Sequence, residues 1–246
     1  MSWFRCAESR PWASMRLVCF PHAGGSAVAY RPWAKAMSPA IEVHAVQYPG
    51  RADRIRDPLI SDSGQVSRLI AGALMPLLDR PVAFFGHSMG AVLAYETARI
   101  LQGRGTQVEH LFASGTRAPH DRGEPGHIAQ RDDDGVAAAM VALGGTDAEI
   151  LQDPEMRALV LPYVRNDFAL IESYRYKPGL DLATPITAIL GDVDPHVTPE
   201  QATRWADLTT AGFTHKVLPG GHFYLVPQQQ AVLTEVHTTL NVPITS

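Results

Sequence analysis

The chain has 246 residues, of which 46% are hydrophobic and 19% charged, and its formal net charge is −4. These values are ordinary for one globular domain with a buried core, and the small net charge argues against nucleic acid as the main partner. No apolar run approaches the roughly 20 residues that span a bilayer, so we expect no membrane segment. Residues 1–16 lack the apolar stretch of a secretion signal.

Two cysteines, Cys6 and Cys19, are present in the chain. They do not form a disulfide framework, so we expect a cytoplasmic protein, with Cys19 as a small core residue. No spacing of cysteine and histidine is typical of a structural zinc site, and we expect no metal.

The first half of the chain alternates short apolar segments with segments of helical length. Strands are predicted at residues 16–20, 41–47, 82–85 and 110–114, with helices at 65–78 and 91–102. Parallel strands need such helix-length connections. Two later strands and a closing helix continue the pattern, at residues 186–190, 215–218 and 228–240. We therefore predict an α/β fold with a mostly parallel sheet.

The middle of the chain has no strand pattern. After residue 116 it is rich in proline, glycine, histidine and charge, and it then becomes helical at 135–143 and 154–174. A helical insertion between two strands of an α/β sheet is most simply a lid. The predicted division is an α/β core at 1–116 and 181–246 with a helical lid at 117–180.

Two features of this lid segment have alternative interpretations. Gly144 and Gly145 are compatible with a hinge or with a plain helix stop. The run Asp132-Asp133-Asp134 suggests metal binding, but acidic residues also favour the first turn of a helix. We predict a solvated helix start at this run.

The run Gly86-His87-Ser88-Met89-Gly90 joins an apolar strand to an apolar helix. Gly-x-Ser-x-Gly in this setting is typical of a nucleophile elbow, in which a sharp turn exposes the serine beside a helix N-terminus. The two glycines leave room for the turn. Ser88 is therefore the predicted nucleophile, and a glycine-rich turn with a surface serine is the alternative.

A serine nucleophile needs a base, and an acid to orient that base. In this type of fold the order along the chain is serine, acid and histidine, with the last two in loops after strands. His222 follows two glycines after the strand at 215–218 and is the predicted base. Asp194 is the preferred acid, because it lies further out of its strand than Asp192, the alternative.

Three other histidines are less suitable as the base. His237 lies in a helical pattern and is predicted to be structural, whereas His196 is too near the acid loop. His87 flanks the serine, and its side chain is expected to point away from the reacting face.

An oxyanion formed at Ser88 needs two backbone N–H donors. One is expected from Met89, directly after the nucleophile, and the other from the glycine-rich loop at residues 21–25. This loop lacks the lysine and the spacing of a phosphate-binding P-loop.

Five motifs together resemble the type II (external) thioesterases that accompany polyketide synthases and nonribosomal peptide synthetases. They are Phe20-Pro21-His22-Ala23-Gly24-Gly25, Gln47-Tyr48-Pro49-Gly50-Arg51, Gly86-His87-Ser88-Met89-Gly90, Gly191-Asp192-Val193-Asp194-Pro195 and Pro219-Gly220-Gly221-His222-Phe223. The resemblance extends from about residue 17 to the closing helix.

This resemblance implies an α/β-hydrolase fold with a helical lid over an acyl pocket. It implies the triad Ser88, Asp194 and His222, with oxyanion N–H groups at Ala23 and Met89. The implied reaction is hydrolysis of acyl groups from the phosphopantetheine arm of acyl or peptidyl carrier proteins, which clears aberrant or stalled chains. The implied protein is a monomer without a cofactor, since phosphopantetheine belongs to the substrate.

Other functions fit the same residues. A general carboxylesterase or lipase, and an acyltransferase, use the same triad, and a carrier-binding module with a decayed site is a non-enzymatic alternative. Arg117, Arg122 and Arg131 could form a docking patch for acidic carrier proteins; the alternative is ordinary solvated surface. Tyr163, Phe168 and Tyr174 are expected to pack the lid rather than line the pocket.

Overall fold

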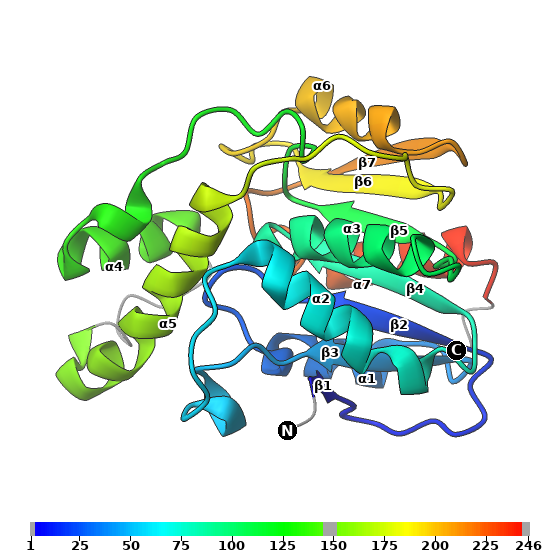
Figure 1. Ribbon diagram of the computed structural model, residues 1–246, viewed down its shortest axis with the longest axis horizontal. Coiled ribbons are helices and arrows are strands. Elements are labelled where there is room, and N and C mark those ends of the chain that lie inside the picture. The colour runs from blue at the N-terminus through cyan, green and yellow to red at the C-terminus, as the bar shows by residue number, and fades with distance from the viewer. Residues whose placement is uncertain (1–2, 145–151, 243–246) are drawn as a thin grey trace.

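The computed structural model describes residues 3–144 and 152–242. Within them a seven-stranded sheet has the order β1-β3-β2-β4-β5-β6-β7 (Figure 1). The strands are β1 Phe4–Arg5, β2 Met15–Phe20, β3 Ile41–Val46, β4 Val82–His87, β5 Leu111–Ser114, β6 Ile186–Gly191 and β7 Phe213–Leu218. Only the β1–β3 pair is antiparallel among these strand pairs. The predicted mostly parallel sheet is confirmed.

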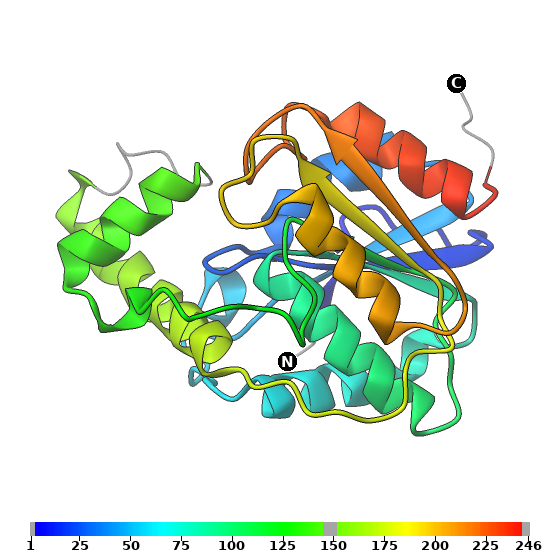
Figure 2. The same ribbon diagram turned by 90° about the horizontal axis from the view of Figure 1, so that it is seen from above.

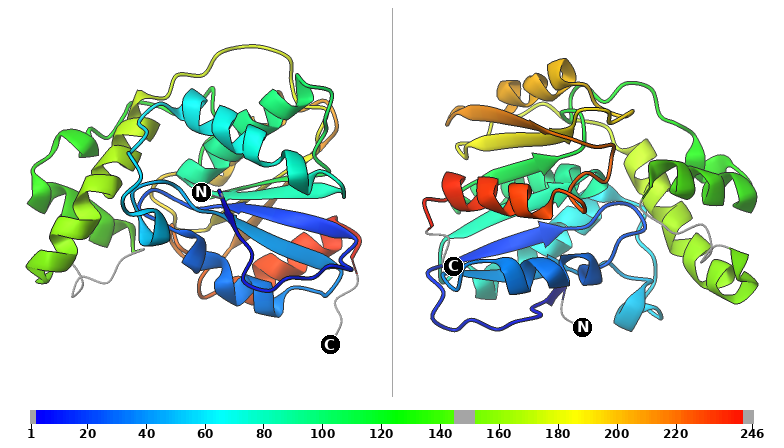
Figure 3. Two further views of the ribbon diagram at one scale, coloured as in Figure 1. Left: turned by 60° about the horizontal axis from the view of Figure 1, so that its bottom comes forward. Right: turned by 180° about the vertical axis from the view of Figure 1, so that it is seen from behind.

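Helices cover both faces of this sheet (Figures 1 and 3). They are α1 Arg31–Ala36, α2 Ser63–Ala73, α3 Met89–Gln102, α4 Asp133–Leu143, α5 Pro154–Ser173, α6 Pro199–Ala202 and α7 Gln229–Thr239. Helices α2, α3 and α6 pack on one face, and α1 and α7 on the other. No described helix has the length and apolar character needed to cross a membrane.

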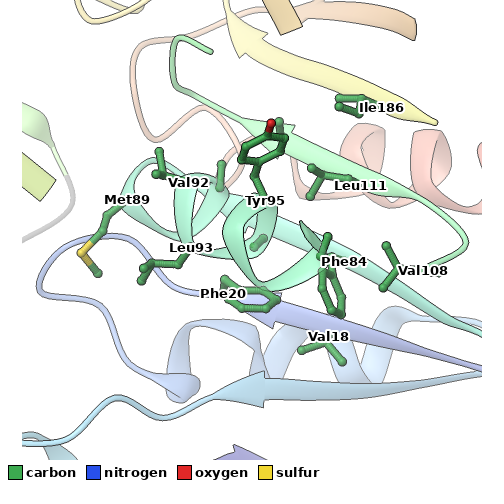
Figure 4. Close-up of a cluster of buried hydrophobic side chains, with 14 of the residues drawn as sticks. Val18, Phe20, Phe84, Met89, Val92, Leu93, Tyr95, Val108, Leu111 and Ile186 are labelled. Carbon is green, nitrogen blue, oxygen red and sulfur yellow. The ribbon is translucent and has the colours of Figure 1, made fainter. Parts of the chain in front are cut away.

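Side chains alternate along each strand, so the sheet separates two cores. On β2, Val18 and Phe20 join the cluster under α2 and α3, whereas Leu17 and Cys19 join the cluster under α1 and α7. Figure 4 shows the first cluster, with Phe20 and Phe84 of the sheet against α3. Cys19 is fully buried, as predicted.

Most predicted elements are confirmed, and the differences have local causes. The helix predicted to reach residue 78 ends as α2 at Ala73, because Pro76 has no N–H for the helical hydrogen bond and disfavours helical backbone before it. β1 has two residues and α1 has six, too few for a periodic pattern to stand out. Both were missed.

The segment between β5 and β6 contains a short 3-10 helix, η4 (Ile128–Gln130), followed by α4 and α5. These helices pack around a small apolar cluster of their own and project beyond the sheet (Figure 2). Asp132 caps α4 by accepting the N–H of Gly135 over 2.8 Å, as a helix start requires. Gly144 ends α4 in the left-handed conformation, with φ 82°.

The sequence left two interpretations for Gly144, a hinge or a plain helix stop. Its left-handed conformation at the end of α4 is that of a plain helix stop. Gly145 lies outside the described residues. We call residues 117–180 the lid; both the role of this segment as a lid and its boundaries stay a prediction.

Candidate active site

Ser88 occupies a sharp turn between a buried strand and a helix. β4 ends at His87 and α3 begins at Met89, and Ser88 has φ 54° and ψ −119°. A positive φ is unfavourable for a residue with a side chain, so this backbone must be held by its surroundings. The Ser88 N–H donates to the carbonyl of Ser114 on β5 over 2.8 Å. The serine is thereby fixed at the carboxyl end of the sheet.

Gly86 and Gly90 make this turn possible. A Cβ on Gly86 would lie 2.4 Å from Cα of Ala91, and a Cβ on Gly90 would lie 2.0 Å from the carbonyl oxygen of Phe20. Both distances are far shorter than a van der Waals contact. Neither position therefore accepts a side chain unless the backbone moves.

Asp194 and His222 lie in loops that follow the neighbouring strands β6 and β7. Nδ1 of His222 and Oδ2 of Asp194 are 3.0 Å apart, and their side chains are 4% and 0% exposed. A Cβ on Gly191 would lie 2.1 Å from the carbonyl oxygen of Gly220, so glycine here lets the two loops approach. The predicted imidazole and carboxylate are thus brought together.

Asp192, the alternative carboxylate, has another position. Its side chain is exposed, and its Oδ1 accepts the N–H of Gly220 over 2.8 Å. Asp194 instead accepts the His196 N–H on Oδ1 over 2.9 Å, which leaves Oδ2 facing the imidazole of His222. The geometry favours Asp194 as the partner of His222, while Asp192 braces the loop.

Ser88 and His222 line one cavity of about 370 Å³, together with Ala23 and Met89. The loop after β5 and the lid complete its wall with residues that include Gly115, Arg117, Arg122, Phe168 and Tyr174. Within the described residues the Ser88 hydroxyl makes no hydrogen bond. If His222 is the base for Ser88, as predicted, their side chains must approach more closely than in this structure, which is common once substrate is bound.

The N–H groups of Ala23 and Met89 have no protein acceptor in the described parts of the chain, whereas Gly24 donates to Asp167 over 2.8 Å. Met89 is the first residue of α3, where free N–H groups and the helix dipole favour negative charge. Both N–H groups are therefore unpaired in the described structure, and their role in an oxyanion hole stays a prediction. We call residues 21–25 the oxyanion loop.

Four further histidines lie near His222 or were weighed as alternative bases. The ring centroids of His87 and His222 are 5.0 Å apart, and Nδ1 of His87 is hydrogen bonded to a serine hydroxyl of β5 over 2.9 Å. Burial lowers the pKa of His87 well below its usual value and that of His22 to about 3. Both rings are therefore neutral near pH 7. His196 is exposed, and His237 is buried in α7, away from the cavity.

A buried ion pair that the sequence analysis missed lies behind the oxyanion loop. Arg51, which follows β3, donates to both carboxylate oxygens of Asp167 on α5, over 2.5 and 2.7 Å. Asp167 also accepts the N–H of Gly24, and Arg51 also donates to the carbonyl of Gly25 over 3.0 Å. The pair therefore ties a lid helix to the loop that carries Ala23.

The sequence signal for this pair was incomplete. Arg51 belongs to the Tyr48-Pro49-Gly50-Arg51 motif, but Asp167 lies 116 positions further along the chain. Asp167 is an acid on an otherwise largely apolar helical face, and it is almost fully buried. The available signal was that Asp167 occupies a position where the helical pattern of α5 expects an apolar residue, which indicates a buried acid that needs a partner.

The three lid aromatic residues differ in their surroundings. The Tyr163 ring packs on Arg51, with the guanidinium carbon 4.7 Å from the ring centroid. Phe168 and Tyr174 are buried, and both also line the cavity. All three side chains pack in the lid, as expected, and Phe168 and Tyr174 also contribute to the cavity wall.

The three arginines of the predicted docking patch differ in their surroundings. Arg131 is exposed and donates to the Gly126 carbonyl over 3.3 Å. Arg117 and Arg122 line the cavity, and Nη1 of Arg122 is closed off from solvent. The chain after β5 folds back on the acid loop, where Arg117 donates to the His196 carbonyl over 3.3 Å. Arg117 and Arg122 therefore belong to the cavity wall, and the docking patch stays a prediction.

One group of metal-ligating side chains is found in the described structure, formed by Cys6, Glu42 and His44. It lies at the amino end of β3, opposite the end of the sheet that carries Ser88. Glu42 already accepts hydrogen bonds from Arg16 and from a backbone N–H. This group takes no part in the candidate site.

The Thioesterase domain family model matches residues 15–240, from β2 to α7. The chain belongs to the thioesterase family. This thioesterase is 45% identical over 240 residues to the probable cadicidin biosynthesis thioesterase of Streptomyces griseus, covering 97% of the chain and 66% of that protein. It is 38% identical over 245 residues to Thioesterase PikA5 of Streptomyces venezuelae, covering 98% of the chain and 86% of that protein.

A solved structure of the type II thioesterase BorB, from the borrelidin biosynthetic cluster, is similar throughout. The TM-score is 0.90 at 39% identity, with 97% of each chain covered. The predicted resemblance to type II thioesterases is confirmed, and so are the predicted α/β-hydrolase fold and the assignment as a thioester hydrolase.

Proposed function

We propose that this thioesterase removes acyl groups from the phosphopantetheine arm of acyl or peptidyl carrier proteins through an acyl-enzyme on Ser88. The observation that carries the proposal is the buried Asp194–His222 hydrogen bond behind a cavity that His222 and Ser88 both line. The structural relative YbtT supports the substrate class, because it is a type II thioesterase from a nonribosomal peptide and polyketide (NRPS/PKS) biosynthetic pathway.

In the proposed first step, Nε2 of His222 takes the Ser88 proton as Oγ attacks the thioester carbonyl. Asp194 accepts the Nδ1–H of His222, which fixes the tautomer and stabilises the imidazolium. The N–H groups of Ala23 and Met89 stabilise the oxyanion. The C–S bond then breaks, and His222 returns the proton to the departing sulfur.

In the second step His222 takes a proton from water as the water oxygen attacks the acyl-enzyme. The second tetrahedral intermediate collapses, the bond between carbon and Ser88 Oγ breaks, and the serine regains its proton from His222. A thiol with a pKa of about 8.5 is a good leaving group. The side chains named here can complete this cycle, and we propose that no cofactor is needed. We also propose that the protein is a cytoplasmic monomer.

A substrate panel tests the proposal against its alternatives. We expect acyl groups on a phosphopantetheinylated carrier to be hydrolysed faster than the same acyl groups in oxygen esters, and to yield free acid even with an alcohol or amine present. Faster oxygen-ester hydrolysis would indicate a carboxylesterase or lipase. Transfer to the acceptor would indicate an acyltransferase, and failure of a serine-directed probe to label the protein would indicate a binding module.

A further inference from the structure

Arg122 is a cation without a counter-ion inside the cavity that Ser88 and His222 line. Its Nη1 is closed off from solvent, and it has no hydrogen bond partner among residues 3–144 and 152–242. Buried polar groups are nearly always hydrogen bonded, and a buried charge without a partner is destabilising. A residue of this kind in a ligand cavity indicates that the partner arrives with the ligand.

A second guanidinium lies next to it. A Cβ on Gly123 would lie 2.8 Å from Nη1 of Arg117, which places the Arg117 side chain against the residue that follows Arg122. Burial lowers the pKa of Arg122 to about 10, which still leaves it charged at neutral pH. Two positive side chains therefore share this part of the wall.

The acidic residues of the same cavity do not neutralise them. Glu172 accepts the N–H groups of Ile128 and Ala129 over 2.5 and 3.2 Å, so its carboxylate is used at the start of η4. Glu124 is exposed, and no ion pair joins either glutamate to Arg122 in the described parts of the chain. The wall around Arg122 is thus left with a net positive charge.

We propose that Arg122, with Arg117 beside it, forms a subsite for an anionic oxygen group of the thioester substrate. Arginine binds carboxylates and phosphates through paired N–H donors, and such charge-assisted hydrogen bonds are short and strong. The anion is either a carboxylate on the acyl chain or the phosphate of the phosphopantetheine arm. The inference rests on the proposed function and specifies which thioesters the cavity prefers.

Two matched pairs of small thioesters separate these sources. Malonyl- and propionyl-N-acetylcysteamine differ in an acyl carboxylate, and propionyl-4′-phosphopantetheine and propionyl-pantetheine differ in a phosphate. We expect Arg122→Met to lower kcat/KM at least about tenfold for the anionic member of one pair and less than about threefold for its neutral counterpart, and Arg122→Lys to keep part of the preference. A tenfold change corresponds to about 1.4 kcal/mol.

The matched control is Arg157→Met, which removes a lid arginine that already has an acidic partner, Asp134. This control is expected to change no substrate preference. Thermal unfolding gives an independent reading: removing a cation without a protein partner should leave Tm unchanged or raise it. A uniform loss of activity across all four thioesters, or a marked fall in Tm, would overturn the subsite.

Binding measurements keep the subsite separate from the proposed reaction. The amide analogues of the four thioesters are titrated calorimetrically into Ser88→Ala protein, with and without Arg122→Met. Selective binding of an anionic analogue that is lost with Arg122 supports the subsite even if the wild-type protein hydrolyses none of the thioesters. Hydrolysis of all four with no anion preference in binding rejects the subsite and leaves the proposed function standing.

Discussion

Buried ion pairs lie at opposite ends of the sheet. At the carboxyl end, Arg51 and Asp167 have side-chain exposures of 2% and 3%. At the amino end, Arg16 on β2 and Glu42 on β3 have exposures of 9% and 7% and approach to 3.1 Å. The first pair joins a loop to a lid helix, whereas the second joins two adjacent strands.

Their remaining partners separate the two pairs. Glu42 also binds the ring of His44 over 2.7 Å, so its charge is shared within the sheet. The Arg51–Asp167 pair instead holds a backbone N–H and a carbonyl of the oxyanion loop. Similar ion pairs therefore stabilise the sheet at one end and position a loop of the candidate site at the other.

The largest expected effect is that of Ser88→Ala, which tests whether the reaction takes place at the carboxyl end of the sheet. Ser88→Ala removes the proposed nucleophile, and we expect kcat for a small thioester to fall by about 10³-fold or more, as when other serine triads lose their nucleophile. The control is Ser14→Ala, at the amino end of β2, with expected wild-type activity. Retention of full activity by Ser88→Ala would refute the proposed nucleophile.

The two aspartates of the acid loop give the next largest contrast. Asp194→Asn removes the acceptor for the imidazole N–H, and we expect kcat to fall by about 10³- to 10⁴-fold. Asp192→Asn keeps an oxygen that can accept the Gly220 N–H, so a change below about tenfold is expected. Steady-state kinetics on one thioester measure both, and equal losses would contradict the assignment of the acid.

The two ion pairs themselves are compared through Asp167→Asn and Glu42→Gln. Both variants are expected to lower Tm, because each weakens a buried pair. Only Asp167→Asn should also lower kcat, by about 10- to 100-fold with little change in KM, because Asp167 holds the oxyanion loop through Gly24. Asp167→Glu should recover part of the loss.

Kinetics are measured at a temperature where calorimetry shows both proteins to be folded. If Glu42→Gln loses as much kcat as Asp167→Asn, the positioning role of the Arg51–Asp167 pair fails.

The smallest effect concerns pH and the amino end of the sheet. Burial lowers the pKa of His110, just before β5, to about 4. The histidine pKa in the unfolded chain is about 6.5. Between this pKa and the folded one, the unfolded chain holds a proton that the native protein lacks, so stability falls as pH falls through this window. His110→Gln should reduce the loss of unfolding free energy between pH 7 and 5 by on the order of 1 to 2 kcal/mol.

Urea unfolding at the two pH values measures this change. An undiminished loss in His110→Gln would show that His110 makes no such contribution. The kcat of this variant at pH 7 should stay within about twofold of wild type, because His110 lies at the end of the sheet opposite Ser88.

The sequence by itself determined strands β2 to β7, the turn at Ser88 and the loops that carry Asp194 and His222. These features depend on neighbouring residues: apolar alternation selects strands, and steric limits on φ make Gly86 and Gly90 necessary. Because parallel strands end at one edge, the loops after β4, β6 and β7 come together without further information.

Tertiary structure alone decided the surroundings of Arg51 and Arg122. The pairing of Arg51 with Asp167 depends on how α5 packs against the oxyanion loop, and no local rule relates residues 116 positions apart. The same holds for Arg122, which sequence placed on the surface and which the returning chain after β5 places in the cavity wall. Burial and the identity of ion-pair partners are properties of packing, and sequence periodicity does not contain them.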